Sequence, residues 1–413
     1  MLAPYFYRHS ELAVEDVLLT DIAEKEGTPL YVYSRAAIVN QFRDYNKAFG
    51  TAPHQVCYAV KANSNLSILR LLAEEGAGFD IVSGGELYRV LQAGGDPAKV
   101  VFSGVGKTRQ EVEYAIASGI HSFNCESEAE LALIDSIAAR NGRRARISLR
   151  VNPNVDAQTH PYISTGLHDH KFGINIDLVK EVYDRAAKLE HLSMEGVSCH
   201  IGSQLLDTNP LFEALEGVLA LIDTLRAAGH PISHLDMGGG LGVAYTNAQQ
   251  PPDTENYIAQ ICDRTASRGL KLMVEPGRSI VASAGVLLTR VLYRKTTATK
   301  EFVIVDAAMN DLIRPALYQA HHEIVPLRQR PLGTIKADIV GPVCESGDFF
   351  ARDREIANLF PGDFAALMTA GAYGFVQSSN YNSRPRPAEV LVDGGSYRVI
   401  RRRETNEDLI RGE

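Results

Sequence analysis

The chain has 413 residues, of which 45% are hydrophobic and 22% are charged. This composition is typical of a folded protein large enough for two domains, and it excludes a disordered chain. The formal net charge is -8, and the largest basic cluster is Arg401-Arg402-Arg403. We therefore expect neither nucleic acid nor a membrane as a partner.

The N-terminal segment, residues 1–8, lacks the basic start and apolar core of a signal peptide, and no window approaches transmembrane length. We therefore expect a cytoplasmic protein. The five cysteines are odd in number and widely scattered, which argues against a disulfide framework or a zinc site, so no metal is expected. Four of them stand in apolar contexts typical of a core: Cys57, Cys125, Cys199 and Cys262.

Short apolar runs that alternate with amphipathic helical stretches dominate the chain from residue 35 onward. There are eight such runs, at residues 56–60, 79–82, 100–103, 122–125, 147–151, 196–200, 235–237 and 272–274. Eight β-then-α units in succession predict a closed (β/α)8 barrel of the TIM type, whereas an open doubly wound sheet usually has six strands or fewer. The predicted α/β barrel spans residues 35–280.

Residues 281–413 read as strands without long helices between them. The expected strands cover residues 285–294, 301–306, 336–341, 363–368, 389–392 and 397–401, and the last two form a hairpin on Asp393-Gly394-Gly395. We predict a second, all-β domain. The N-terminal residues 1–34, with the strand-like run Leu30-Tyr31-Val32-Tyr33, are expected to join it.

Polar residues and glycines gather just after the apolar runs, at the rim where a barrel builds its site. Lys61 ends the first run, where apolar surroundings would raise the nucleophilicity of an amine and suit it to a Schiff base. On this segment alone, a surface lysine at a strand end is the simpler interpretation. Gly238-Gly239-Gly240-Leu241-Gly242, after the seventh run, is a candidate phosphate cradle or a plain tight turn, and it fails the dinucleotide fingerprint.

Two further rim residues carry possible chemistry. Glu275 could keep a heterocyclic nitrogen protonated or form an ion pair with Arg278. His200 could stack on an aromatic cofactor or be an ordinary core histidine. An amine, a glycine cradle, an acid and a histidine face together are what pyridoxal 5'-phosphate (PLP) requires of a protein.

The motifs on this rim resemble those of the fold-type III PLP-dependent decarboxylases. They are Tyr58-Ala59-Val60-Lys61-Ala62-Asn63, Phe79-Asp80-Ile81-Val82-Ser83-Gly84-Gly85-Glu86, Cys199-His200-Ile201-Gly202-Ser203-Gln204, the glycine run and Glu275-Pro276-Gly277-Arg278. Four later motifs resemble the bacterial diaminopimelate decarboxylases within that group: His160 to Gly166, Met309 to Tyr318, Gly341 to Asp348, and Gly371 to Gly374.

The resemblance implies a set of cofactor contacts. Lys61 would form the Schiff base, His200 would stack on the ring, and Glu275 would pair with the pyridine nitrogen. The phosphate region would be held by Ser203, Gly238, Gly239, Gly240, Gly277, Arg278 and Tyr373, with Asp80 and Arg150 around the cofactor.

The resemblance also implies a reaction, the decarboxylation of meso-2,6-diaminopimelate to L-lysine and CO2, the last step of lysine biosynthesis. Family members are homodimers with shared active sites, so Cys344, the expected proton donor, and Glu345 would reach in from the other subunit. The distal carboxylate of the substrate would meet Arg278, Arg314 and Tyr318, with Tyr373 nearby, and the distal ammonium would meet Glu345.

Three alternatives keep the same scaffold. A decarboxylase of D-lysine or D-ornithine is disfavoured by Arg314, because those substrates have no distal carboxylate. A racemase is disfavoured by Glu275, because a strong electron sink suits decarboxylation. A non-catalytic PLP-binding homologue would need Lys61 but not Cys344. The polar stretch at residues 246–253 matches no motif.

Overall fold

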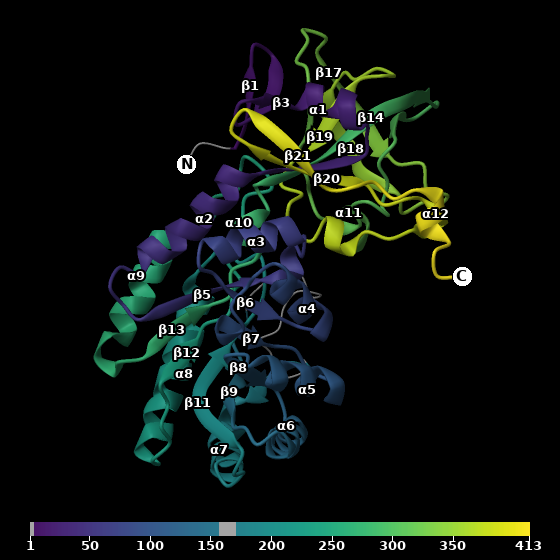
Figure 1. Ribbon diagram of the computed structural model, residues 1–413. Helices are drawn as coiled ribbons and strands as arrows, with labels where there is room; N and C mark the ends of the chain where they lie inside the picture. The colour runs from purple at the N-terminus through teal and green to yellow at the C-terminus, as the bar shows by residue number, and fades with distance from the viewer. Residues whose placement is uncertain (1–3, 157–170) are drawn as a thin grey trace. The chain divides into compact units, whose positions relative to one another are not determined.

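The computed structural model describes residues 4–156 and 171–413, so the motif at residues 160–166 lies outside the described residues. The chain divides into two compact units. The barrel unit comprises Phe42–Gly242 and Pro251–Gly277, and the β unit comprises Met1–Gln41, Val243–Gln250 and Arg278–Glu413. Figure 1 labels their helices and strands along the chain.

The barrel unit is a closed ring of parallel strands. In ring order these are β5 His54–Ala59, β6 Gly78–Ile81, β7 Val100–Phe102, β8 Ser122–Cys125, β9 Ala145–Asn152, β11 Leu192–Cys199, β12 His234–Asp236 and β13 Lys271–Val274. β8 pairs with β9 and β13 pairs with β5, which closes the ring. The predicted barrel is confirmed, and every apolar run overlaps one strand.

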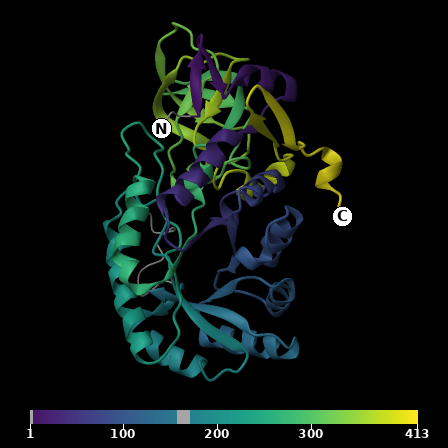
Figure 2. The same cartoon turned by 60° about the vertical axis from the view of Figure 1, so that its left-hand side comes forward.

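Helices follow the strands around this ring and lie outside it (Figure 2). They are α3 Leu66–Glu74, α4 Gly84–Gln92, α5 Arg109–Ser118, α6 Glu128–Arg140, α7 Val179–Ala186, α8 Asn209–Ala227 and α9 Thr254–Thr265, while α2 Arg35–Ala48 precedes β5. Polar rim residues cap several of them: the side chains of Ser83, Thr108 and Ser127 each accept a hydrogen bond from a first-turn N–H. The polar residues at the strand ends therefore also begin the helices.

The β unit is built on a sheet of strand order β18-β17-β15-β14-β4-β20-β21, in which β19 also pairs with β14 and β16 pairs with β19. The strands are β4 Leu30–Ser34, β14 Gly285–Thr296, β15 Glu301–Val305, β16 Ile324–Pro326, β17 Thr334–Val340, β18 Phe349–Ala357, β19 Phe364–Leu367, β20 Ala388–Asp393 and β21 Ser396–Arg401. The predicted all-β architecture is confirmed, and so is the hairpin, because Asp393 pairs with Ser396 across Gly394-Gly395. β4 lies between β14 and β20, so the N-terminal strand does join this sheet.

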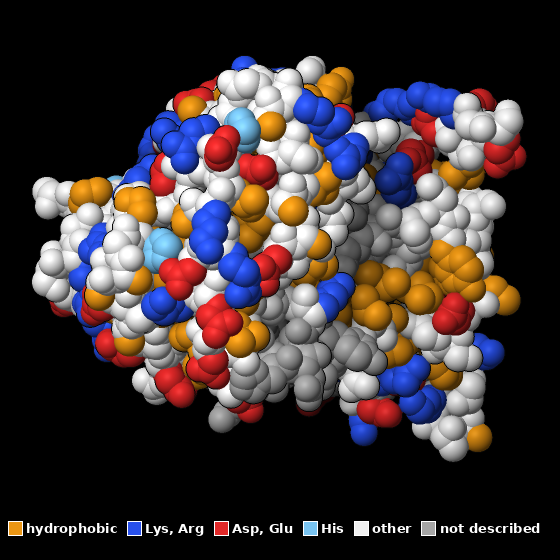
Figure 3. All heavy atoms as spheres, turned by 90° about the horizontal axis from the view of Figure 1, so that it is seen from below, with side chains coloured by type: hydrophobic (Ala, Val, Ile, Leu, Met, Phe, Trp, Pro, Cys, Tyr) orange, Lys and Arg blue, Asp and Glu red, His pale blue; other side chains and the backbone are white. Residues whose placement is uncertain are grey.

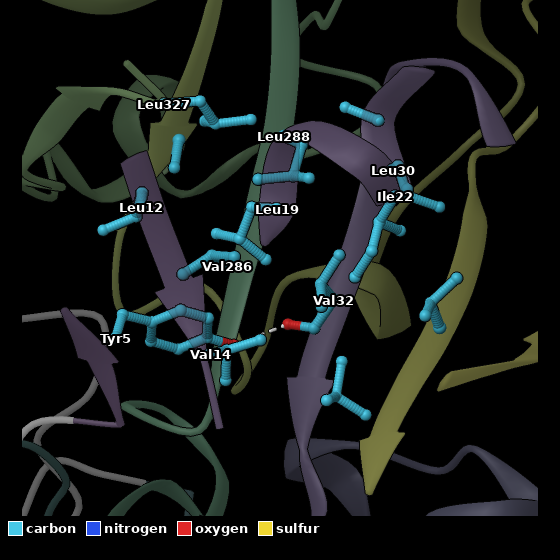
Figure 4. Close-up of a cluster of buried hydrophobic side chains, with 14 of the residues drawn as sticks. Tyr5, Leu12, Val14, Leu19, Ile22, Leu30, Val32, Val286, Leu288 and Leu327 are labelled. Atoms are coloured by element: carbon cyan, nitrogen blue, oxygen red, sulfur yellow. Dashed lines mark hydrogen bonds between the residues drawn. The ribbon is translucent and has the colours of Figure 1, made fainter. Parts of the chain in front are cut away.

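A hydrophobic core lies between this sheet and the N-terminal segment, which forms β1 Tyr5–Arg8, β2 Glu11–Val14, β3 Val17–Leu18 and α1 Leu19–Glu26. Figure 4 shows side chains of the core, such as Leu19 and Val286, pointing toward one another. The Tyr5 hydroxyl donates to the carbonyl of Val32 at 2.8 Å, so the one polar group of this tyrosine is satisfied inside the core. Burial of these apolar side chains stabilises the unit.

Three of the cysteines expected in the core are buried, but Cys262 is only partly buried, because it stands on the outward side of α9. No helix in the described part of the chain is long and apolar enough to cross a membrane. On the face of the molecule seen in Figure 3, basic and acidic side chains are interspersed.

Candidate active site

Lys61 stands directly after β5, in the short 3-10 helix Val60–Ala62, and its Nζ forms an ion pair with Oδ2 of Asp80. Asp80 is fully buried on β6, which pairs with β5, the strand that precedes the lysine. Its second oxygen, Oδ1, has no hydrogen-bond partner among the described residues. Since a buried carboxylate oxygen without a donor is costly, this oxygen marks a place where a polar ligand group would be accommodated.

His200 follows β11 and faces the glycine run. The N–H of Gly239 donates to Nδ1 of His200 at 3.2 Å. Burial lowers the pKa of His200 well below its ordinary value, and the charges of Arg150 and Lys61 lower it further. The ring is therefore a neutral imidazole, and its proton lies on Nε2.

Arg150 lies near the C-terminal end of β9, on the same rim. Its Nη1 donates to Oε1 of Glu126 at 3.0 Å, and its Nη2 donates to the carbonyl of His200 at 3.4 Å. Glu126 also accepts the N–H of Gly173 at 2.8 Å. This network joins the ends of three strands, β8, β9 and β11, and brings Arg150 to the histidine.

The glycine run after β12 is required by close packing. Gly238 and Gly240 have φ values of 64° and 119°, which favour glycine. A Cβ at Gly238 would lie 2.6 Å from the carbonyl O of Cys199, and one at Gly240 would lie 2.8 Å from the carbonyl O of Gly202, the residue before Ser203. The glycine run therefore packs closely against the end of β11 and the loop that follows it, which contains Ser203.

Gly277 is likewise confined, because a Cβ there would lie 2.9 Å from Cβ of Ala62, the residue after the lysine. Its neighbour in sequence, Pro276, accepts the N–H of Ala59 at 3.1 Å. The end of β13 is thus held against the end of β5. These contacts bring the candidate residues of the barrel unit to one rim, as the sequence predicted.

Glu275 is a buried acid on this rim and is accompanied by a second one. Its Oε1 accepts hydrogen bonds from Ser103 Oγ and Asn124 Nδ2, both at 3.2 Å, and the same Nδ2 lies 3.2 Å from Oδ2 of Asp236. Burial raises the pKa of Glu275 well above its ordinary value, and the nearby Asp236 raises it further. A cationic ring nitrogen beside Glu275 would favour its carboxylate form and would form an ion pair with it.

The β unit holds a second cluster, centred on Tyr245. Nη1 of Arg278 donates to the Tyr245 hydroxyl at 2.6 Å, and the Arg314 guanidinium lies 4.6 Å from the centre of the same ring. The Tyr373 ring lies 4.8 Å from the Arg278 guanidinium. Both arginines are buried, so this cluster concentrates positive charge away from water.

Tyr318 completes the set expected for a carboxylate. It ends α11 Arg314–Tyr318, one helical turn beyond Arg314, and its hydroxyl accepts from Nε2 of Gln377 at 3.4 Å. The structure therefore brings four predicted residues of the β unit together: Arg278, Arg314, Tyr318 and Tyr373.

Cys344 and Glu345 lie in the exposed loop between β17 and β18. Buried Asp348 shapes this loop by accepting the N–H groups of Val343 and Met309, both at 2.7 Å. The N–H of Cys344 donates to Oδ1 of Asn382 at 2.8 Å, and the hydrogen bond to Glu345 raises the pKa of the Tyr381 hydroxyl. The thiol and the carboxylate are thus presented on the surface of the loop.

Sequence reasoning missed three residues of these clusters. Tyr245 precedes the polar stretch that matched no motif, and the structure explains part of that stretch, because Gln249 Oε1 accepts the Tyr245 N–H at 2.8 Å. His322 binds Arg314, and Asp236 accompanies Glu275. For Asp236 the only signal in the sequence was a polar side chain inside the seventh apolar run; the other two residues stand in loops without a pattern.

The comparisons with known proteins agree with this geometry. Residues 35–282 match the family of pyridoxal-dependent decarboxylases, pyridoxal binding domain. A diaminopimelate decarboxylase of Pseudomonas aeruginosa is 59% identical over 409 residues, which cover 99% of this chain and 98% of the relative. The chain belongs to the diaminopimelate decarboxylase family. It is therefore a carboxy-lyase, as predicted.

Other members of this family are similar over nearly their whole length. The diaminopimelate decarboxylase of Vibrio cholerae is 54% identical, over 98% of this chain and 97% of the relative. A Helicobacter pylori diaminopimelate decarboxylase complexed with L-lysine superposes with a TM-score of 0.92 at 45% identity, covering 95% of this chain and 98% of that chain. The M. jannaschii diaminopimelate decarboxylase in co-complex with L-lysine superposes with a TM-score of 0.94 at 38% identity, covering 99% of this chain and 98% of that chain.

The rim of the barrel unit fits a pyridoxal group on three observations. Asp80 Oδ1 is buried without a donor beside the amine of Lys61. The glycine run has no room for side chains. Glu275 is a buried acid with a raised pKa, and a cationic nitrogen beside it would stabilise its carboxylate form. Among the described residues, no group of acidic, histidine or cysteine side chains could hold a metal ion.

Proposed function

We propose that the chain converts meso-2,6-diaminopimelate to L-lysine and CO2 with pyridoxal 5'-phosphate held on the rim of the barrel unit. The observation that carries the substrate choice is the pair of buried guanidiniums, Arg278 and Arg314, which both contact Tyr245. Two arginines suit the carboxylate of a second amino-acid head, because each can offer two parallel N–H donors to it. A simple diamine has no carboxylate for these arginines to bind.

Residues of the barrel unit would hold the cofactor. Lys61 would bind its aldehyde covalently through Nζ, and Asp80 would keep that amine oriented. His200, neutral and fixed by the Gly239 N–H, would lie against the ring. Glu275 would pair with the ring nitrogen. The phosphate would lie against backbone N–H groups of Gly238, Gly239, Gly240 and Gly277, with Ser203, Arg278 and Tyr373, while Arg150 would stand beside the histidine.

The cofactor, when bound, supplies an electron sink for the electron pair that remains on carbon after CO2 departs. The chain then has to return a proton to that carbon. Cys344 would donate it from Sγ, because a thiol on an exposed, hydrogen-bonded loop can enter a site and leave it again. Arg314, Arg278 and Tyr318 would hold the distal carboxylate meanwhile, and Glu345 the distal ammonium.

We propose a homodimer in which the loop of Cys344 and Glu345 serves the site of the other subunit. The exposure of both residues on that loop supports this assignment. We also keep the proposed division into a cofactor-binding domain, residues 35–280, and a β domain, residues 281–413 with 1–34. A cytoplasmic location is supported by the five cysteines, all of which are free.

The test is CO2 release by the purified protein supplied with PLP and, separately, meso-diaminopimelate, D-lysine, D-ornithine, L-ornithine and L-arginine. We expect release from diaminopimelate only. Release mainly from D-lysine or D-ornithine would leave Lys61 and the cofactor in place but would overturn the assignment of Arg314 and Glu345. No release from any of them, with PLP bound, would favour a non-catalytic binder.

A further inference from the structure

Arg314 is held in place by a histidine rather than by an acid. His322 is fully buried, and its Nδ1 lies 2.8 Å from the carbonyl O of Met368, while its Nε2 lies 2.8 Å from Nη1 of Arg314. A carbonyl can only accept and a guanidinium can only donate. The proton of the imidazole is therefore on Nδ1, and Nε2 accepts the hydrogen bond from Arg314.

The surroundings keep this imidazole neutral and fixed. Its pKa lies well below the ordinary value because of burial, with the charge of Arg314 as the next cause. The ring meets Tyr245 edge-on, with centroids 5.4 Å apart and planes at 82°, and the His322 carbonyl accepts a hydrogen bond from Arg354. The acceptor of Arg314 thus cannot turn away.

Because the neutral His322 accepts the hydrogen bond from Arg314, the positive charge of this arginine is not neutralised. Among the described residues, no carboxylate lies within ion-pair distance of Arg314, although the side chain is buried. A buried guanidinium without a counter-ion is poorly stabilised, and the carboxylate of a bound substrate would supply the missing opposite charge. An aspartate or glutamate in place of His322 would have neutralised the charge in advance.

We propose that His322 is a positioning residue that aims the Arg314 guanidinium at the distal carboxylate of the substrate without neutralising it. The inference rests on the proposed function, in which Arg314 binds that carboxylate. It assigns to His322 a part in substrate recognition that the sequence did not indicate, since the residue stands in a loop beside another histidine.

The test compares H322Q, H322E and H322L with the wild type, and uses H321Q as the matched control, because His321 is adjacent but pairs with Glu323 at the edge of the unit. The measurements are KM and kcat for meso-diaminopimelate and the inhibition constants of L-lysine and cadaverine. L-Lysine has the amino-acid head that the arginines would hold, whereas cadaverine has no carboxylate.

We expect H322E, which pairs Arg314 internally, and H322L, which removes the acceptor, to raise KM and the L-lysine inhibition constant about 10- to 100-fold. The inhibition constant of cadaverine and the kcat should change less than about threefold. H322Q, whose Oε1 can accept from Arg314, should stay within about threefold of the wild type, as should H321Q. PLP absorbance should be unchanged in all four.

H322E with wild-type affinity for L-lysine would overturn the inference. Equal weakening of L-lysine and cadaverine would overturn it too, because a merely structural role moves both ligands. If H322L does not fold, H322E and H322Q still decide the question. Failure of the proposed function looks different: the wild type itself would then release no CO2 from diaminopimelate.

Discussion

The N–H of Gly239 donates to Nδ1 of His200 at 3.2 Å, and this contact fixes both the tautomer and the orientation of the imidazole. It joins the loop after β11 to the glycine run after β12, so the residue expected to face the cofactor ring is held by the segment expected to bind its phosphate. Neither segment could set this geometry alone.

The state of this histidine can be measured. Burial, followed by the charges of Arg150 and Lys61, lowers the pKa of His200, so we expect a neutral ring throughout the pH range in which the protein stays folded. Nitrogen NMR of the histidine rings, with the His200 signal assigned from a His200→Gln variant, checks this. A His200 signal that titrates near the ordinary value of about 6.5 would contradict it.

Lys61→Ala should abolish the visible absorbance of bound PLP, because the only proposed covalent attachment is lost. Asp80 would also lose its ion pair with the Lys61 amine. The measurement is an absorbance titration with PLP. Lys188→Ala, which changes an exposed lysine after α7, is the matched control and should bind PLP like the wild type. An unchanged Lys61→Ala spectrum would remove the cofactor assignment.

Cys344→Ala should keep the PLP spectrum and the melting temperature but lower turnover of diaminopimelate by about 10²- to 10⁴-fold, the usual contribution of a general acid. The exposed position of the thiol on its loop is the reason to expect no loss of stability. Cys262→Ala, on the outer helix α9, serves as the control. Turnover near the wild-type rate would exclude Cys344 as the proton donor.

Asp311, which accepts the N–H of Ala308 at 2.8 Å, should make the stability of the β unit depend on pH. Burial raises its pKa to about 7. The folded state therefore binds more protons than the unfolded state between about pH 4 and pH 7, and the free energy of unfolding falls as the pH rises through this window. From about pH 5 to pH 8 the loss is at most about 3 kcal/mol.

Urea unfolding of the wild type and Asp311→Asn at these two pH values measures this difference. The variant should show a flatter pH dependence, while Glu190→Gln, a change at an exposed carboxylate, should behave like the wild type. A pH dependence that is the same in Asp311→Asn and in the wild type would contradict the assignment.

The barrel was predictable because each strand overlaps a short, largely buried apolar run, and helical stretches stand between these runs, several of them with a side-chain N-cap. β18 was not predicted, since it lies at the end of its sheet and carries exposed polar residues such as Arg352 and Asp353. β16 and the strands before β4 are short and were missed for that reason.

The chemistry of the rim was predictable only where a motif carried it. Lys61, His200 and Glu275 stand at strand ends, where a polar side chain is conspicuous. Tyr245 and His322 are recognisable as site residues only from their tertiary contacts with Arg278 and Arg314. Such contacts join residues from different segments, so a local sequence pattern does not reveal them.

We propose above that the arginine cluster holds one amino-acid head of the substrate while the other head loses its carboxylate. The measurement that tests it most directly is the yield of CO2 and the chirality of the lysine formed when wild-type protein, loaded with PLP, consumes a known amount of meso-diaminopimelate. We expect one CO2 per substrate and L-lysine as the sole product. Racemic lysine, or a second CO2 with cadaverine as product, would contradict it.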